Sequence, residues 1–130
     1  MFKTQRSIAA FVLLTISMLL SSYSYAAKTY KCDDLYPPSG WWPKTFSVTY
    51  DSGDVTQMTS DMYRYDLDKV NVRKASNQLI WVTYKSSQKT STGATINVRH
   101  AIKVYPKKGK FHYELVFPNG YRQKAKGYCR

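Results

Sequence analysis

The sequence predicts an all-β fold, a small antiparallel barrel or sandwich of about seven or eight strands, closed by one disulfide. Three observations predict it. Apolar and polar residues alternate over short runs, turn residues separate these runs, and Cys32 and Cys129 lie near the two ends of the predicted mature chain. Helix signals are poor. Residues 61–72 are the one candidate for a turn or short helix, and even there the apolar residues do not follow a convincing 3.6-residue period.

The first 26 residues are predicted to be a signal peptide. Lys3 and Arg6 precede an apolar run over residues 8–20, and Ser24 and Ala26 occupy the positions that signal peptidase recognises. Cleavage after Ala26 leaves residues 27–130 as a single β-domain, because the remaining chain is too short for a second core. The apolar run is short for a membrane span and no second one follows it. We therefore expect a periplasmic or secreted protein with no transmembrane span after signal cleavage.

The two cysteines are expected to form a disulfide, because an exported chain meets an oxidising compartment. A bond between Cys32 and Cys129 suits a sheet whose first and last strands meet, which favours a barrel over a sandwich. Two cysteines without a further Cys or His at finger spacing do not complete a tetrahedral metal site. The sequence thus predicts no metal site and no cofactor.

The strands are predicted in the following order. Alternation over residues 45–50 is followed by a turn at residues 51–54 and a strand over residues 55–59, which indicates a hairpin. Residues 79–84 are rich in β-formers, and residues 86–93 are predicted to be a polar loop. Strands over residues 95–105, 110–117 and 121–128, separated by two Pro/Gly turns, then form an antiparallel meander.

The register of this meander predicts a candidate binding face. If its turns place Tyr105 opposite Lys110 and Phe117 opposite Tyr121, one face is apolar and contains His100. A shift of one residue would bury cations, so this register is preferred. The opposite face then collects six basic side chains around one carboxylate: Arg99, Lys103, His112, Glu114, Arg122, Lys124 and Lys126.

The charge of the chain is unevenly distributed along it. Residues 28–68 hold four basic and seven acidic residues, whereas residues 69–130 hold fourteen basic residues and one acid, Glu114. Such a cationic half either keeps the protein soluble or attracts an anionic partner. Nucleic acid is disfavoured as that partner, because no RNA-binding signature is present and an exported protein rarely meets it.

We expect a binding protein rather than an enzyme. Neither histidine lies in a nucleophile motif, so the sequence predicts no catalytic residue. The first hypothesis is an inhibitor or immunity-type protein that recognises another exported macromolecule through the basic face and through Trp41 and Trp42, which follow a Pro/Gly-rich segment. The alternative is a cationic envelope-associated protein that binds lipopolysaccharide or other anionic polymers. Trp81, within a predicted strand, is expected to belong to the core.

A third possibility comes from a local resemblance. Residues 29–34 (Thr-Tyr-Lys-Cys-Asp-Asp), the late second cysteine and residues 91–94 (Ser-Thr-Gly-Ala) resemble the periplasmic inhibitors of c-type lysozyme. This resemblance covers about ten residues, and it implies a small barrel that inserts a loop into the enzyme's cleft. The chain departs from the family's Ser-x-Ser-Gly-x-x-Tyr motif around Gly93. A cationic inhibitor would also be repelled by a basic lysozyme.

Overall fold

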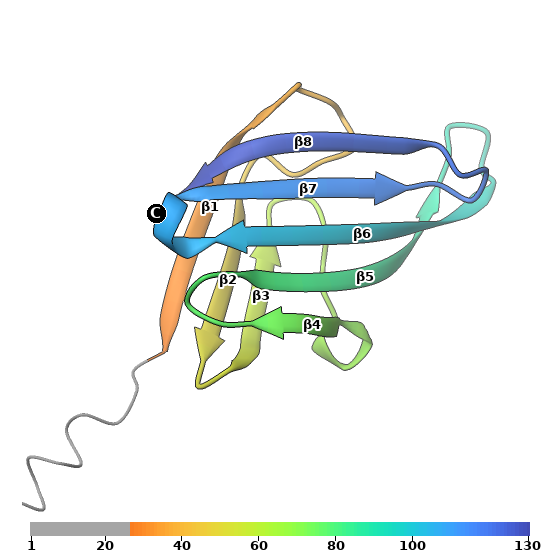
Figure 1. The fold of residues 1–130 in the computed structure, drawn as a ribbon. Helices are drawn as coiled ribbons and strands as arrows, with labels where there is room; N and C mark the ends of the chain where they lie inside the picture. Colours follow the sequence, from red (N-terminus) through yellow and green to blue (C-terminus); the bar gives the residue numbers. More distant parts are fainter. Residues whose placement is uncertain (1–26) are drawn as a thin grey trace, which may run out of the picture.

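The computed structural model describes residues 27–130, which form one antiparallel eight-stranded sheet (Figure 1). The predicted signal peptide lies outside the described residues. Two short 3-10 helices, η1 (Leu67–Lys69) and η2 (Pro106–Lys108), lie between strands. The strands are β1 (Lys28–Tyr36), β2 (Phe46–Asp51), β3 (Asp54–Ser60), β4 (Asn71–Ala75), β5 (Ile80–Lys89), β6 (Thr95–Tyr105), β7 (Lys110–Val116) and β8 (Arg122–Cys129).

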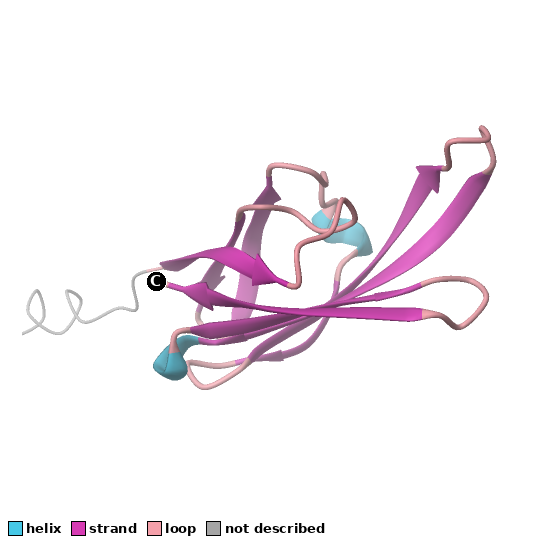
Figure 2. Ribbon diagram, turned by 90° about the horizontal axis from the view of Figure 1, so that it is seen from above, coloured by secondary structure: helices cyan, strands magenta, loops and turns pink. Residues whose placement is uncertain are grey.

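The sheet curls into a nearly closed barrel, as the sequence predicted. The strand order is β3-β2-β1-β8-β7-β6-β5-β4, so the first strand pairs with the last, and β3 and β4 form the two edges. Figure 2 shows this curvature from above, with the ends of β5 and β6 projecting past the rest of the barrel. Closing a sheet on itself removes most of the exposed strand edge that would otherwise invite aggregation.

The core lies inside this curve and is built from alternate residues of each strand. Val98, Ile102 and Val104 of β6 are fully buried, and so are Phe111 and Leu115 of β7. Aromatic rings fill the centre: Phe46 of β2 stacks on Phe111 across the barrel with 5.9 Å between ring centroids. Period-two alternation therefore sorts the side chains of these strands into an interior and an exterior set.

The meander of β6, β7 and β8 has the predicted register. Tyr105 lies opposite Lys110, and the backbone N–H of Phe117 donates to the carbonyl of Tyr121 across the second turn. The β2–β3 hairpin is also confirmed, with a two-residue turn in which Ser52 and Gly53 both have positive φ. Such turns match the right-handed twist of the strands they join.

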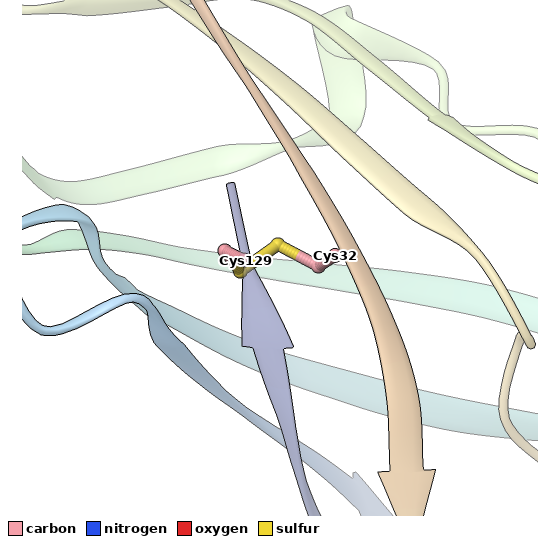
Figure 3. The surroundings of a disulfide bond; sticks show 2 residues. All are labelled: Cys32 and Cys129. Carbon is pink, nitrogen blue, oxygen red and sulfur yellow. A yellow bond between two sulfur atoms is a disulfide. The ribbon is translucent and has the colours of Figure 1, made fainter.

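The predicted disulfide joins β1 to β8. Cys32 and Cys129 lie directly opposite each other in the two strands and are bonded through their sulfur atoms (Figure 3). Next to the bond, Lys31 and Arg130 exchange two backbone hydrogen bonds of 2.9 Å. The covalent link thus fixes the pairing of the two ends of the described chain.

The structure differs from the predicted strands in three places. β5 continues to Lys89, into the segment that was predicted to be a polar loop. Its backbone stays paired with β6 up to the pair of Lys89 with Thr95, although none of its side chains after Tyr84 is buried. The candidate turn or short helix over residues 61–72 contains the short helix η1, but its last two residues begin the edge strand β4, which was not predicted. β1 was not assigned as a strand, since only Cys32 within it is fully buried and its sequence shows little apolar alternation.

Within residues 27–130, no helix has the length and apolar character needed to cross a membrane.

Candidate binding surface

The predicted basic side chains lie together on the outer surface of β6, β7 and β8. Antiparallel partners point to the same side of a sheet, and the partners here are Lys103 with His112, His112 with Lys126, and Glu114 with Lys124. Their inward neighbours form the core, so these side chains face outward. We call this set the basic face: Arg99, Lys103, His112, Glu114, Arg122, Lys124 and Lys126.

Glu114 lies in the middle of the basic face and is already paired. Its carboxylate oxygens lie 3.2 Å from Arg122 Nη1 and 4.0 Å from Lys124 Nζ. The two cations are well exposed, so these ion pairs contribute little to stability. The positive charge of Arg99, Lys103 and Lys126 has no carboxylate partner among the described residues. The face therefore carries a surplus of positive charge toward solvent.

The pKa of His112 is lowered by its surroundings on the basic face. Partial burial lowers the pKa of His112, and the nearby charges of Lys126, Lys103 and Lys110 lower its pKa further. The ring of Tyr105 packs edge-on against the imidazole with 5.2 Å between centroids. Since its pKa is lowered, His112 is neutral at neutral pH and adds no fixed charge to the basic face.

Cations on β4 and β5 widen the basic face beyond what the sequence predicted. Exposed Lys85 of β5 lies opposite Arg99, and exposed Lys74 of β4 lies opposite Trp81. The alternation of side chains along a strand would have placed both lysines on the outer face. They were missed because β4 was not predicted and the predicted strand over residues 79–84 ends before Lys85. These cations thus lie on five neighbouring strands, β4 to β8, whose arrangement can be followed in Figure 1.

Trp81 belongs to this outer surface, so its assignment to the core was wrong. Its neighbours Ile80 and Val82 point into the barrel, which leaves Trp81 half-buried on the outside. Lys103 Nζ lies 4.6 Å from the centroid of the indole ring, a cation–π contact. The indole Nε1 has no hydrogen-bond partner among the described residues. The ring therefore lies against the side chain of Lys103 on the outer surface of the sheet.

Trp41 and Trp42 do not act together. Trp42 is only 6 % exposed, and its indole Nε1 donates a 2.8 Å hydrogen bond to the carbonyl of Pro37. Because it is buried, Trp42 does not belong to the predicted contact surface. Of the two adjacent tryptophans, one packs into the core and the other stays closer to the surface. Trp41 is half-buried and packs edge-on against Phe117 with 5.1 Å between centroids.

A second polar cluster lies inside the barrel. His100 is fully buried, with Nε2 2.7 Å from Ser86 Oγ and Nδ1 2.6 Å from the hydroxyl of Tyr113, which lies 2.8 Å from the hydroxyl of Tyr65. Burial lowers the pKa of His100 to about 4. Ser86 beside His100 has the spacing of a nucleophile and its base, but an imidazole with so low a pKa is a weak general base.

The part of the chain that the structure describes contains no group of three or more His, Cys, Asp or Glu residues that could hold a metal ion. Comparison with known proteins adds no assignment: no protein-family model, curated protein or solved structure matches this chain.

Proposed function

We propose that this protein is exported and binds an anionic envelope polymer, such as lipopolysaccharide or another acidic polysaccharide, through its basic face. The observation that carries the proposal is the surplus of outward cations around a single carboxylate, Glu114, that Arg122 and Lys124 already engage. The Cys32–Cys129 bond supports export, because disulfides persist in oxidising compartments.

The composition of the face favours a polymer over a folded protein. The centres of protein interfaces are depleted in lysine and enriched in aromatic anchors. Here Glu114 and its cations hold the centre and Lys103 covers the half-buried ring of Trp81, while the exposed aromatic side chains Tyr121 and Tyr128 lie near the two ends of β8. Rows of cations on a curved sheet suit a flexible polyanion, which can follow the surface.

Charge reversal tests the proposal. We expect Arg122→Glu combined with Lys124→Glu to weaken binding of the purified exported protein to lipopolysaccharide by roughly tenfold or more, since each change replaces attraction with repulsion. Binding by the unchanged protein should also weaken as salt is raised, because exposed charges are screened. Isothermal titration at low and high salt measures both effects.

The matched control is Lys28→Glu combined with Lys44→Glu. Both lysines are exposed, lie outside β4 to β8, and change the net charge by the same amount. If the control weakens binding as much as the Arg122/Lys124 variant, net charge alone drives association and no face is recognised. Binding that neither salt nor the Arg122/Lys124 variant alters contradicts the proposal.

An inhibitor or immunity-type protein is the second candidate, and one observation favours it. Trp41, Ile96, Phe117 and Tyr121 line an apolar hollow of about 440 Å³ beside the β7–β8 turn, and Tyr121 is 58 % exposed. A protein partner could anchor an apolar side chain there. One exported protein retained in stoichiometric amount at high salt, by the Arg122/Lys124 variant as well as by the unchanged chain, would favour this function.

A further inference from the structure

A pocket of about 380 Å³ opens where β7 and β8 meet β1, at the end of the basic face next to the disulfide. Its size is that of a small-molecule site. Lys126 lies opposite both His112 and Tyr36, and Tyr128 lies opposite Lys110. The residues that line it are Asp34, Tyr36, Lys110, His112, Lys126, Gly127 and Tyr128.

An irregularity of β1 builds this pocket. The register between β1 and β8 shifts between Asp33 and Tyr36, and Asp34 has a φ of 56° within the bulge. Bulges redirect side chains and recur beside functional sites. Gly127 forms part of the pocket wall, and a Cβ there would lie 2.6 Å from the backbone oxygen of Asp33. The missing side chain therefore lets β1 approach β8 closely.

Two tyrosines make the pocket amphipathic. Tyr36 is 75 % exposed and Tyr128 is 62 % exposed, whereas Tyr65, Tyr84 and Tyr113 are buried in the core. A pyranose ring presents C–H groups on its faces and hydroxyl groups around its edge. Exposed tyrosine rings supply a flat apolar surface for such C–H faces and a hydroxyl group for hydrogen bonds.

The charged groups of the pocket are mostly basic. The lining includes two ammonium groups, those of Lys110 and Lys126, and one carboxylate, that of Asp34. The neutral imidazole of His112 lies opposite Lys126 and two residues after Lys110 on β7. Ammonium groups attract a phosphate or carboxylate as point charges. The Asp34 carboxylate is acceptor-only and so suits the hydroxyl groups of a sugar.

We propose that this pocket binds an acidic sugar unit, a pyranose that carries a phosphate or carboxylate group. Its ring contacts Tyr36 and Tyr128, its anionic group lies at Lys110 and Lys126, and its hydroxyl groups donate to Asp34. The inference rests on the proposed function, because it names the chemistry of the polymer unit that is held at one end of the basic face.

Amide NMR titration with monosaccharides tests the proposal. We expect glucuronate and glucose 6-phosphate to shift the amide signals of residues 34–36 and 126–128 in a saturable manner, and glucose at the same concentrations to leave them in place. Tyr36→Ala and Tyr128→Ala should each lower the affinity for glucuronate by roughly two- to tenfold, as expected for loss of one aromatic contact. Both side chains are exposed, so neither change removes core packing.

Tyr121→Ala is the matched control, because it removes an exposed tyrosine at the opposite end of β8 and should leave the affinity unchanged. Inorganic phosphate that binds as tightly as glucose 6-phosphate would overturn the sugar assignment and leave a general anion site. Monosaccharides that shift no pocket signal would overturn the inference.

The proposed function fails separately from the pocket. If lipopolysaccharide binding depends on Arg122 and Lys124 while no monosaccharide shifts the pocket signals, the pocket assignment is wrong and the basic face stands. If the monosaccharides bind while the Arg122/Lys124 variant binds lipopolysaccharide as tightly as the unchanged protein, the proposal for the basic face is wrong and the proposal for the pocket is retained. Stoichiometric capture of a folded protein that Tyr36→Ala abolishes would assign the pocket to a protein partner and overturn the sugar proposal.

Discussion

His100 shows how a polar residue can be placed in the core of this barrel. Its two ring nitrogens lie within hydrogen-bond distance of the hydroxyl groups of Ser86 and Tyr113. A neutral imidazole offers one donor and one acceptor, and hydroxyl groups can take either role, so both nitrogens are satisfied. The aromatic rings that face it are those of Tyr63, Tyr65, Tyr84 and Tyr113, and burial raises the pKa of Tyr65 to about 12. His100 is thus surrounded by hydroxyl groups and aromatic rings.

The stability of the protein should therefore fall in mild acid. The folded-state pKa of His100 is about 4, below the value of about 6.5 in an unfolded chain. Between these values only the unfolded state binds the proton, so the free energy of unfolding decreases as pH falls from about 6.5 to about 4. The full shift corresponds to roughly 3 kcal/mol. Denaturant unfolding across this pH range measures the decrease.

His100→Gln removes this titration and is expected to flatten the dependence of unfolding free energy on pH. His112→Gln is the control, because His112 is half-exposed on the outer face and should account for a smaller part of the slope. A His100→Gln protein whose unfolding free energy keeps the full slope between about pH 4 and 6.5 would contradict the assignment.

At the scale of single residues, the sequence predicted the basic side chains better than the tryptophans. Alternation within one meander was enough to place Lys103 and Glu114 outward, because a strand has only two faces. Trp81 obeys the same alternation, yet its apolar character favoured an inward position. Trp42 lies outside any strand, so its burial depends on where the chain between β1 and β2 packs, which no periodicity encodes.

At the scale of elements, the close approach of β1 and β8 depends on Gly127. A Cβ at this position would collide with the ring of Phe111 and with the backbone oxygen of Asp33. Neither group can move freely, since Phe111 is fully buried and Asp33 belongs to β1 next to the disulfide. Glycine in a strand commonly marks such close contact between backbones.

Gly127→Ala is therefore expected to lower the free energy of unfolding by roughly 1–3 kcal/mol, the usual cost of overpacking. Gly40→Ala is the control, because a Cβ there meets nothing within 4 Å and the residue lacks a positive φ. Denaturant midpoints of the two variants give the comparison. Equal midpoints for Gly127→Ala and the unchanged protein would show that β1 does not lie as close to β8 as described.

Strands with strong apolar alternation could be predicted from the sequence, and strands held mainly by backbone pairing could not. The burial pattern of β6 and β7 follows the period of two closely, and their register was predicted residue by residue. β1 and β4 bury few of their side chains and are held in place mainly by backbone pairing with the neighbouring strands. The pocket between β1 and β8 was missed for the same reason.

At the scale of the whole molecule, charge and sheet order together polarise the barrel. The acidic residues of the described chain lie mainly on β1 to β3 and the segment that follows, while cations dominate β4 to β8. The two parts meet where β1 pairs with β8, and there Arg130 lies 3.6 Å from Asp33. A barrel built this way has one positive side, whose field extends into solvent over a distance set by ionic screening.

The disulfide holds these two parts of the sheet together, and its loss should be costly. The bond closes a loop with a sequence separation of 97 residues, for which the chain-entropy model gives roughly 4–5 kcal/mol. We expect Cys32→Ala combined with Cys129→Ala to lower the free energy of unfolding by up to about that amount. Alanine is chosen because both cysteines are buried. Thermal unfolding followed by circular dichroism measures the loss.

Reducing agent provides the control for this variant. A thiol reductant should lower the melting temperature of the unchanged protein toward that of the double alanine variant, and it should leave the variant itself unaffected. Agreement of the two values assigns the effect to the covalent link rather than to lost packing of sulfur atoms, since the reduced cysteines still fill their sites. A melting temperature that neither treatment lowers would mean that backbone pairing of β1 with β8 is sufficient by itself to close the barrel.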